Sequence, residues 1–236
     1  MTFENYNSAI NWLFNQFPAF QKVGSSAYKP TLENTRNLIR YFDLDLDKLT
    51  FVHVAGTNGK GTTCSIIASA STESGYKTGL FTSPHIHDFK ERIRIDGHKI
   101  EEDYVVDFIT TVQSINWDIK PSFFEITWVL ALKYFIDKKC DLVIAETGLG
   151  GRLDATNVIS PLVTAITNIG LDHINILGDT KAAIAKEKAG IIKYNTPVFI
   201  GTEDQEVVSV FNAFAKSNQA PLTLIKTNSL SNFDKN

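Results

Sequence analysis

The chain has 236 residues, 43% of them hydrophobic and 21% charged, which is enough apolar material for the core of one large domain. Its 23 basic and 26 acidic residues give a net charge of -3, with no basic run that would follow a nucleic acid or an anionic membrane. Two cysteines outside any metal-binding spacing, no signal peptide and no uncharged apolar stretch of about 20 residues predict a soluble, cytoplasmic protein.

Short apolar runs alternate with segments of helical period along the chain. Strands are expected at 51–56, 77–83, 142–148, 162–170 and 197–201, with a further strand after 220. Helices are expected near 62–74, 103–115, 122–138, 180–190 and 204–217. This alternation predicts an α/β fold with a mostly parallel sheet flanked by helices on both faces. Such sheets bind ligands at the carboxyl ends of their strands, where Gly56, Ser83, Glu146 and Asn168 fall.

A glycine-rich stretch, GTNGKGT at 56–62, follows the first expected strand. It departs from the usual phosphate-loop spacing, because its first glycine stands only three residues before Gly59 and because Gly61 separates Lys60 from Thr62. A strand before it and a helix after it still provide a tight turn, free backbone N–H groups and a positive helix end. The stretch favours phosphate binding, and a plain strand-to-helix turn with an exposed lysine is the alternative.

Two further segments carry a carboxylate or imidazole at the same predicted edge. Glu146 ends an apolar strand and could ligate magnesium or position water, although a structural acid is an equal interpretation. Glycines at 148, 150 and 151 allow a close ligand approach or simply form a flexible turn. Taken alone, His173 would be interpreted as a hydrogen-bonded polar residue rather than a ligand, but it becomes a candidate site residue because Lys60, Ser83 and Glu146 fall at the same edge.

Other polar groups are weaker candidates. His85 and His87 could suggest zinc, but no third ligand with suitable spacing follows, so surface or hydrogen-bonded histidines are favoured. The run Lys186-Glu187-Lys188 before Gly190 is typical of a solvated helix face that ends at a glycine cap.

Six motifs together resemble one family. HVAGTNGKGTT, TSPH followed by ERIRI, SFFE, AETGLGGRLDATN, LDH and KEKAGI stand in the order and approximate spacing of the folylpolyglutamate synthase and dihydrofolate synthase family, a branch of the Mur-ligase superfamily, from about residue 28 to about 200. The resemblance implies a P-loop NTPase-like Mur-ligase central domain in an ATP-dependent acid–amino-acid ligase of folate biosynthesis and one-carbon metabolism. Such an enzyme adds L-glutamate to the carboxylate of a folate or dihydropteroate through an acyl phosphate. ATP and Mg²⁺ would be its cofactors, its partners would be these small molecules, and a monomer is expected.

The resemblance also assigns roles to residues. The ATP phosphates would be held by Gly56, Thr57, Asn58, Gly59, Lys60, Gly61 and Thr62. Catalytic roles fall to Lys60, Glu146, His173 and Lys188, and metal ligation to Ser83, Glu146, His173 and, if carbamylated, Lys188. This replaces the solvated-face interpretation of Lys188. Pterin binding falls to Ser122, Phe123, Phe124, Glu125, Leu153, Asp154 and Ala155, although Phe123 and Phe124 could equally be core residues.

The expected domain organisation is one ATP-binding domain over residues 1–236, truncated at its C-terminal end. The family's second, carboxyl-terminal Rossmann-like domain has no counterpart in this sequence and is expected to be absent, so the activity of the shortened chain stays open. Two alternatives also stay open: a Mur-type peptidoglycan-precursor ligase, and a nucleotide-binding module without ligase activity. Gly61 directly after Lys60 and the GLGGRLDATN stretch argue for the folate branch.

Overall fold

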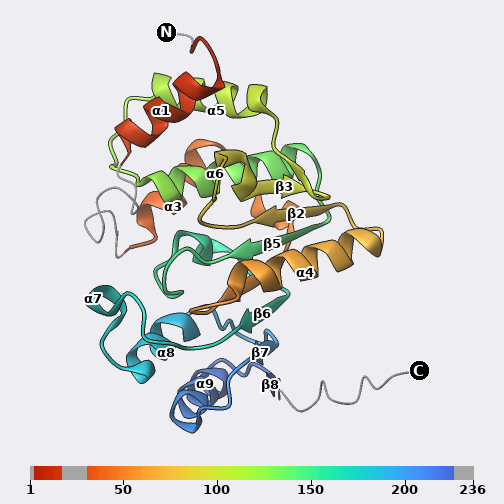
Figure 1. Cartoon of the computed structure of the whole chain (residues 1–236), viewed down its shortest axis with the longest axis vertical. Coiled ribbons are helices and arrows are strands. Elements are labelled where there is room, and N and C mark those ends of the chain that lie inside the picture. The colour runs from red at the N-terminus through yellow and green to blue at the C-terminus, as the bar shows by residue number, and fades with distance from the viewer. Residues whose placement is uncertain (1–2, 18–30, 226–236) are drawn as a thin grey trace.

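The computed structural model describes residues 3–17 and 31–225. Within these ranges eight strands form one sheet in the order β4-β3-β2-β5-β1-β6-β7-β8 (Figure 1). The strands are β1 Thr50–Ala55, β2 Thr78–Phe81, β3 Ile93–Ile95, β4 His98–Lys99, β5 Leu142–Glu146, β6 Val163–Ile166, β7 Val198–Ile200 and β8 Leu222–Leu224. β2, β5, β1, β6, β7 and β8 run parallel, while β3 and β4 form an antiparallel edge. The expected α/β fold with a mostly parallel sheet is confirmed.

Helices connect and cover these strands. They are α1 Tyr6–Gln16, α3 Glu33–Tyr41, α4 Lys60–Glu73, α5 Glu102–Ser114, α6 Phe123–Asp137, α7 Ile174–Leu177, α8 Lys181–Ala189 and α9 Gln205–Ser217, with 3-10 turns η2 Leu46–Lys48, η3 Phe89–Arg92 and η4 Ala155–Val158. α1 packs on α5 at one end of the molecule, and α8 packs on α9 at the other (Figure 1). No helix within the described ranges is long and apolar enough to cross a membrane.

The two faces of the sheet bury different sets of side chains, because successive residues of a strand point to opposite faces. On one face Phe51 joins a large cluster under α6, and on the other Val52 and Val54 pack with Cys64 and Ala68 of α4. β6, β7, α8 and α9 share a third cluster that includes Ile166 and Phe211.

The parallel register brings the strand ends together. Val54 pairs with Glu146 of β5, and Ala55 pairs with Ile166 of β6. The loop after β1 therefore starts between the loops that follow β5 and β6. This is the edge at which the sequence predicts ligand binding.

Differences from the sequence prediction lie in boundaries and in peripheral elements. α4 begins at Lys60 rather than near residue 62, because Gly59 takes a left-handed conformation (φ 77°) at the N-cap position. β2 and β6 end at Phe81 and Ile166, before the expected 83 and 170, because the residues that follow bond to loops and side chains instead. The sequence interpretation missed α1, α3, α7 and the β3–β4 edge.

Candidate active site

The phosphate-loop candidate is fixed by the segment that follows β6. The Thr57 N–H donates to the Asn168 carbonyl oxygen at 3.0 Å, and the Asn58 N–H donates to Asn168 Oδ1 at 2.9 Å. Gly56 has a φ of 148°, and a Cβ there would collide with the side chain of Thr167. Only glycine combines this backbone conformation with so close an approach. The loop after β1 is thus held against β6 by its own backbone.

The N-terminus of α4 opens directly from this loop. Its first intrahelical bond runs from the Thr63 N–H to the Gly59 oxygen at 2.9 Å, and Gly59 provides no side-chain cap. The preceding helical N–H groups therefore have no partner within the helix. Lys60 Nζ folds back to the Thr57 oxygen at 3.2 Å. An uncapped 14-residue helix with a lysine in its first turn can bind an anion.

Glu146 ends β5 beside this helix and is 3% exposed. Its Oε2 accepts a hydrogen bond from the Ser83 N–H at 3.0 Å, and a Cβ on Gly61 would lie 3.4 Å from the same oxygen. Burial raises the pKa of the Glu146 carboxyl above its ordinary value, while the Ser83 N–H and the charge of Lys60 oppose that shift. The lack of a side chain at Gly61 lets the start of α4 approach the carboxylate.

Lys188 is buried, at 4% exposure, so the solvated-face interpretation of this residue is wrong. Its Nζ donates to the Gly56 oxygen at 2.8 Å. Burial, and then the charge of Lys60, lower the pKa of the Lys188 amine to about 8. The position of α8 explains the burial, because the Arg152 N–H donates to the Glu187 oxygen at 2.7 Å and docks the helix on the loop after β5.

His173 lies on the same edge of the sheet and is exposed. It precedes α7 with a φ of 49°, and its Nε2 lies 3.6 Å from Asp172 Oδ2. Among the described residues, no three His, Cys, Asp or Glu side chains are grouped so that they could hold a metal ion. The structure thus joins Ser83 to Glu146 and Lys188 to the phosphate loop, and leaves His173 at the rim.

The segment expected to bind pterin starts α6. Ser122 and Glu125 form a capping box, in which the Ser122 N–H donates to Glu125 Oε2 at 2.7 Å and the Glu125 N–H donates to Ser122 Oγ at 3.2 Å. Phe123 is 2% exposed and stacks on Phe14 at 4.3 Å between ring centroids. Phe124 lies 5.7 Å from the Phe81 ring. The first turn of α6 is therefore built into the aromatic core, as one of the two interpretations of these residues expected.

The second such segment, 153–155, leads into η4. Asp154 is 4% exposed, its Oδ2 accepts from the Leu149 N–H at 2.8 Å, and its Oδ1 accepts from the Thr156 N–H at 3.0 Å. Burial raises the pKa of the Asp154 carboxyl, and these donors oppose the rise. Ala155 is also buried, whereas Leu153 is partly exposed. Asp154 thereby closes the glycine loop that follows Glu146.

Sequence reasoning missed a buried arginine next to this site. Arg92 is 2% exposed, its Nε donates to His85 Nδ1 at 2.7 Å, and its guanidinium lies 5.5 Å from the Phe123 ring centre. Burial lowers the pKa of Arg92 to about 10, and the charge of Glu146 opposes that change. His85 is hydrogen-bonded, in line with the favoured interpretation over zinc. The alternation of isoleucine and arginine in ERIRI places Arg92 and Arg94 on the face opposite the buried Ile93 and Ile95, so the sequence carried no signal for the burial of Arg92.

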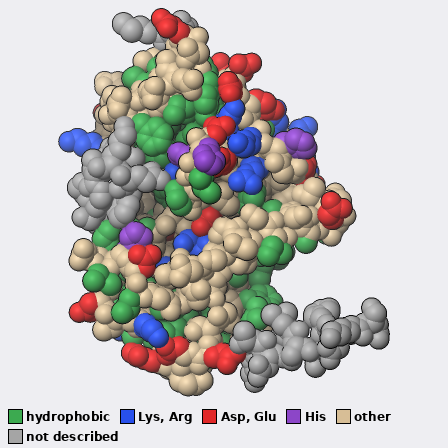
Figure 2. Space-filling view, viewed as in Figure 1, with side chains coloured by type: hydrophobic (Ala, Val, Ile, Leu, Met, Phe, Trp, Pro, Cys, Tyr) green, Lys and Arg blue, Asp and Glu red, His purple; other side chains and the backbone are tan. Residues whose placement is uncertain are grey.

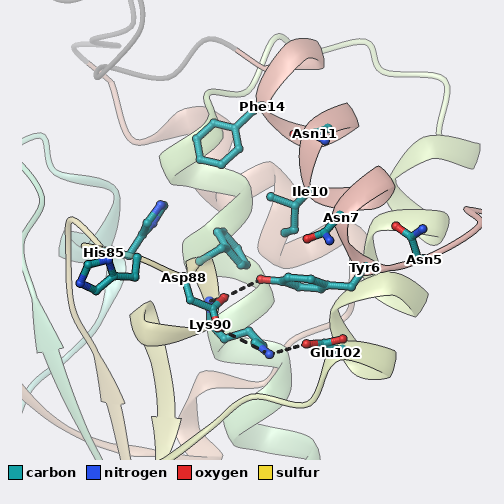
Figure 3. A pocket seen from close by; sticks show the side chains of 12 residues that line it. Asn5, Tyr6, Asn7, Ile10, Asn11, Phe14, His85, Asp88, Lys90 and Glu102 are labelled. Carbon is teal, nitrogen blue, oxygen red and sulfur yellow. Dashed lines mark hydrogen bonds and ion pairs between the residues drawn. The ribbon is translucent and has the colours of Figure 1, made fainter.

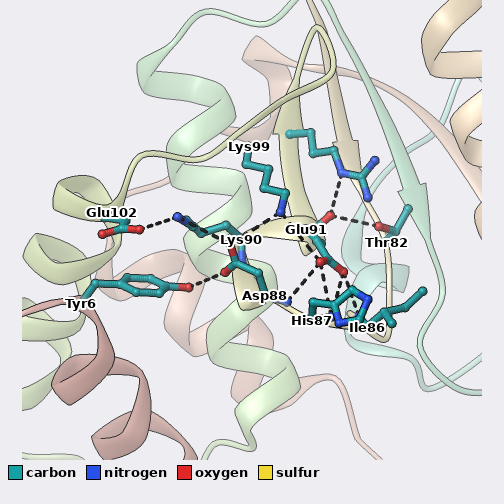
Figure 4. Close-up of polar contacts among 10 residues, drawn as sticks. Tyr6, Thr82, Ile86, His87, Asp88, Lys90, Glu91, Lys99 and Glu102 are labelled. Atoms are coloured by element: carbon teal, nitrogen blue, oxygen red, sulfur yellow. Dashed lines mark hydrogen bonds and ion pairs between the residues drawn. The ribbon is translucent and has the colours of Figure 1, made fainter.

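The loop before Arg92 is organised by the Glu91 carboxylate, which accepts from the backbone N–H groups of Ile86 and Asp88 at 2.8 and 3.1 Å (Figure 4). A cavity of about 490 Å³ lies between α1 and this loop (Figure 3). In it the Tyr6 hydroxyl donates to Asp88 Oδ1 at 3.0 Å, and Lys90 pairs with Glu102. On the described part of the face shown in Figure 2, basic and acidic side chains are interspersed without a continuous basic surface.

Comparison with known proteins agrees with this architecture. Residues 54–235 match the model of the Mur ligase middle domain. The dihydrofolate synthase/folylpolyglutamate synthase of Bacillus subtilis is 40% identical over 226 residues, which cover 93% of this chain and 51% of that protein. The putative folylpolyglutamate synthase of Dictyostelium discoideum is 39% identical over 82% of this chain and 32% of its own length. The chain spans about half or less of the length of these curated relatives.

A solved structure shows the same likeness. E. coli FolC in complex with DHPP and ADP superposes with a TM-score of 0.82 at 32% identity, covering 94% of this chain and 51% of that one.

Proposed function

The chain belongs to the folylpolyglutamate synthase and dihydrofolate synthase family of Mur ligases, and we propose that it forms the ATP-binding part of a ligase that joins L-glutamate to the carboxylate of a folate or a dihydropteroate. The observation that carries the proposal is the meeting of the phosphate loop, Glu146 and Lys188 at one edge of the sheet. ATP as the nucleotide is supported by the relatives, whose solved structures hold ADP or an ATP analogue.

The chemistry proposed for this edge is phosphoryl transfer followed by amide formation. A substrate carboxylate oxygen attacks the γ-phosphorus of ATP, ADP leaves, and an acyl phosphate forms. The amine of glutamate then attacks the acyl carbon, phosphate leaves, and the amine loses a proton. Lys60 and the N–H groups that open α4 stabilise the phosphate oxygens, because carboxylate and nucleotide repel each other as they approach.

A buried carboxylate beside the start of α4 suits Mg²⁺, which prefers oxygen ligands. Ser83 and Glu146, which are hydrogen-bonded to each other, would hold the ion, and His173 would approach it from the rim; the ion would neutralise phosphate charge when bound. A cation would also stabilise the ionised form of the buried Glu146, which burial alone disfavours. The lowered pKa of Lys188 increases the uncharged fraction of its amine, which is the form that can add CO₂ and lose a proton, and a carbamylated Lys188 would supply a further ligand.

The substrate side of the proposal rests on two loops beside Glu146. The first turn of α6 borders the glycine loop that follows β5 through Phe124, whose ring lies against Gly148, and the segment 153–155 borders it through Asp154, which accepts from the Leu149 N–H. A flat pterin would meet the partly exposed Phe124 ring and backbone polar groups there, while the buried Phe123 would support this turn from the core. A monomer located in the cytoplasm completes the proposal, and the buried Cys64 and Cys140 form no disulfide in the structure, which is compatible with that compartment.

The decisive experiment compares two pterin substrates and compares the unaltered chain with a Lys60 variant. The chain is incubated with ATP, Mg²⁺, glutamate and either dihydropteroate or tetrahydrofolate, and phosphate release, product mass and nucleotide affinity are measured. Lys60→Ala should weaken ATP binding or turnover by roughly a hundredfold, because it removes a charge aimed at the phosphates. Lys186→Ala is the matched control, since that lysine of α8 is exposed and should leave both unchanged.

Two results would redirect the proposal. Turnover with a UDP-muramoyl substrate but not with pterins would indicate a peptidoglycan-precursor ligase. Nucleotide binding without turnover of either substrate class would indicate a nucleotide-binding module.

A further inference from the structure

One histidine lies in the middle of the sheet, far from solvent. His53 of β1 is 0% exposed, and its strand neighbours Val52 and Val54 are apolar. Burial lowers the pKa of His53 to about 3, so the ring is neutral. Its Nε2 lies 2.8 Å from Thr156 Oγ1, while Nδ1 has no hydrogen-bond partner among residues 3–17 and 31–225. A buried polar atom without a partner destabilises the fold, so packing alone does not explain a histidine here.

The direction of the hydrogen bonds around Thr156 can be worked out. The Asp154 carboxylate accepts from the Thr156 N–H and also from Thr156 Oγ1, which lies 2.5 Å from Oδ1. Backbone N–H groups donate to both Asp154 oxygens, from Leu149 to Oδ2 and from Thr156 to Oδ1, and these bonds favour the ionised carboxylate against the burial that raises its pKa. An ionised carboxylate only accepts, so the Thr156 hydroxyl proton points to Asp154. The threonine oxygen is then left to accept, and His53 must donate from Nε2.

This chain of hydrogen bonds ends in the loop beside the proposed site. Asp154 Oδ2 accepts from the Leu149 N–H at 2.8 Å, three residues after Glu146. The charge of Asp154 also acts on both Glu146 and Lys188. A shift of Asp154 would therefore move the glycine loop and alter the environment of two site residues.

We propose that His53 is a positioning residue, which donates through Nε2 to Thr156 and so holds the Asp154 carboxylate and the loop 148–155 in the conformation that receives the pterin substrate. The pterin part rests on the proposed function, whereas the hydrogen-bond chain does not. The rigid centre of the sheet thus adds an anchor at Asp154 to a loop that α8 also holds at Arg152, through the Arg152 N–H and the Glu187 oxygen.

The first test addresses the hydrogen-bond chain without any substrate. In the ¹⁵N-histidine-labelled chain, NMR should find His53 protonated at Nε2, and Thr156→Val should shift that resonance. Amide hydrogen exchange at Leu149 should be at least about tenfold faster in His53→Leu. His53→Gln, which keeps an N–H near the place of Nε2, should restore slow exchange. A proton on Nδ1, or exchange at Leu149 that is the same in all three proteins, overturns the proposal.

The second test measures binding of pteroate and of ADP with Mg²⁺ by calorimetry. His53→Leu should weaken pteroate binding about tenfold and leave ADP binding within about twofold, and His53→Gln should recover most of the loss. Thr164→Val is the matched control, because it removes another fully buried hydroxyl of the sheet that bonds to the Pro197 oxygen instead. Equal losses for both ligands in His53→Leu without rescue by glutamine would make His53 merely structural.

These two tests separate the inference from the proposed function. If the unaltered chain binds ADP but no pteroate, the pterin assignment fails, and the Leu149 exchange still decides whether His53 positions the loop.

Discussion

The two faces of the sheet are covered by helices of opposite character. On one face α6 buries Trp128, Leu132 and Phe135 among its 15 residues and is apolar on nearly every side. On the other face α4 buries only Cys64 and Ala68 among its 14 residues. Both helices lie on the central strands, yet one belongs to an extensive aromatic cluster and the other to a small aliphatic one.

This difference separates stability from ligand approach. Large side chains under α6 remove much apolar surface from water, which is the main favourable contribution to folding. The small side chains of α4, and Gly61 in its first turn, let the helix start come close to Glu146. We conclude that the α6 face anchors the sheet, whereas the α4 face carries the proposed phosphate site.

The largest expected effect on stability comes from a substitution on the α6 face. Phe135→Ala should lower the free energy of unfolding by about 3–5 kcal/mol, because a fully buried ring under the sheet is replaced by a cavity. Urea denaturation measures the change. Ile66→Ala, at a position of α4 that is 64% exposed, is the control and should stay within about 0.5 kcal/mol. Equal losses in the two variants would remove the distinction between the faces.

The next largest effect is a pH dependence of the free energy of unfolding, which arises from His53 on the α6 face of the sheet. Its folded pKa of about 3 lies below the ordinary value of 6.5, so the unfolded chain binds a proton first as the pH falls. The contribution of the neutral His53 to the free energy of unfolding is fully present above pH 6.5. It is lost as the pH falls from about 6.5 to 3, by at most about 1.4 kcal/mol per pH unit.

His53→Gln lacks this titration. Urea midpoints measured from pH 7.5 down to 4.5 should therefore fall more steeply for the unaltered chain than for the variant. Parallel curves would contradict the neutral, buried state of this histidine.

The smallest expected effect is on the α4 face. Ile144→Val should lower the free energy of unfolding by about 1 kcal/mol, because it removes one methylene from the small cluster beneath α4. The same urea titration measures it, and ADP affinity should stay within about twofold since the helix start is untouched. A loss as large as that of Phe135→Ala would show that the small cluster anchors the sheet as strongly as the large one.

Long periodic segments were the easiest part of the fold to predict. The expected helix at 122–138 and strand at 142–148 correspond closely to α6 and β5, because each has a continuous apolar pattern and clear end signals. α1 is amphipathic, with Ala9 and Leu13 buried and the asparagines at 7, 11 and 15 exposed, and its capping box of Asn5 and Ser8 is a start signal that the sequence interpretation missed. α7 is one short turn with no periodicity to read.

The site residues also divide into those that local sequence patterns could predict and those that they could not. The ends of β1 and β5 follow from apolar runs, so Gly56 and Glu146 could be placed at one edge before the fold was known. Arg92 could not, because its burial depends on Phe123 and His85, which reach it from other segments.

The sequence by itself determined the alternation of strands and helices, the phosphate-loop candidate and the family, since these reside in local periodicity and in ordered motifs. Only the tertiary structure decided that Lys188 is buried against Gly56, that Gly61 faces Glu146, and that His53 connects to Asp154. Burial and hydrogen-bond partners depend on residues distant in the chain, so no local pattern contains them. The GTNGKGT loop was recognisable from its glycines and from the strand and helix that flank it, but its environment is set by β5, β6 and α8.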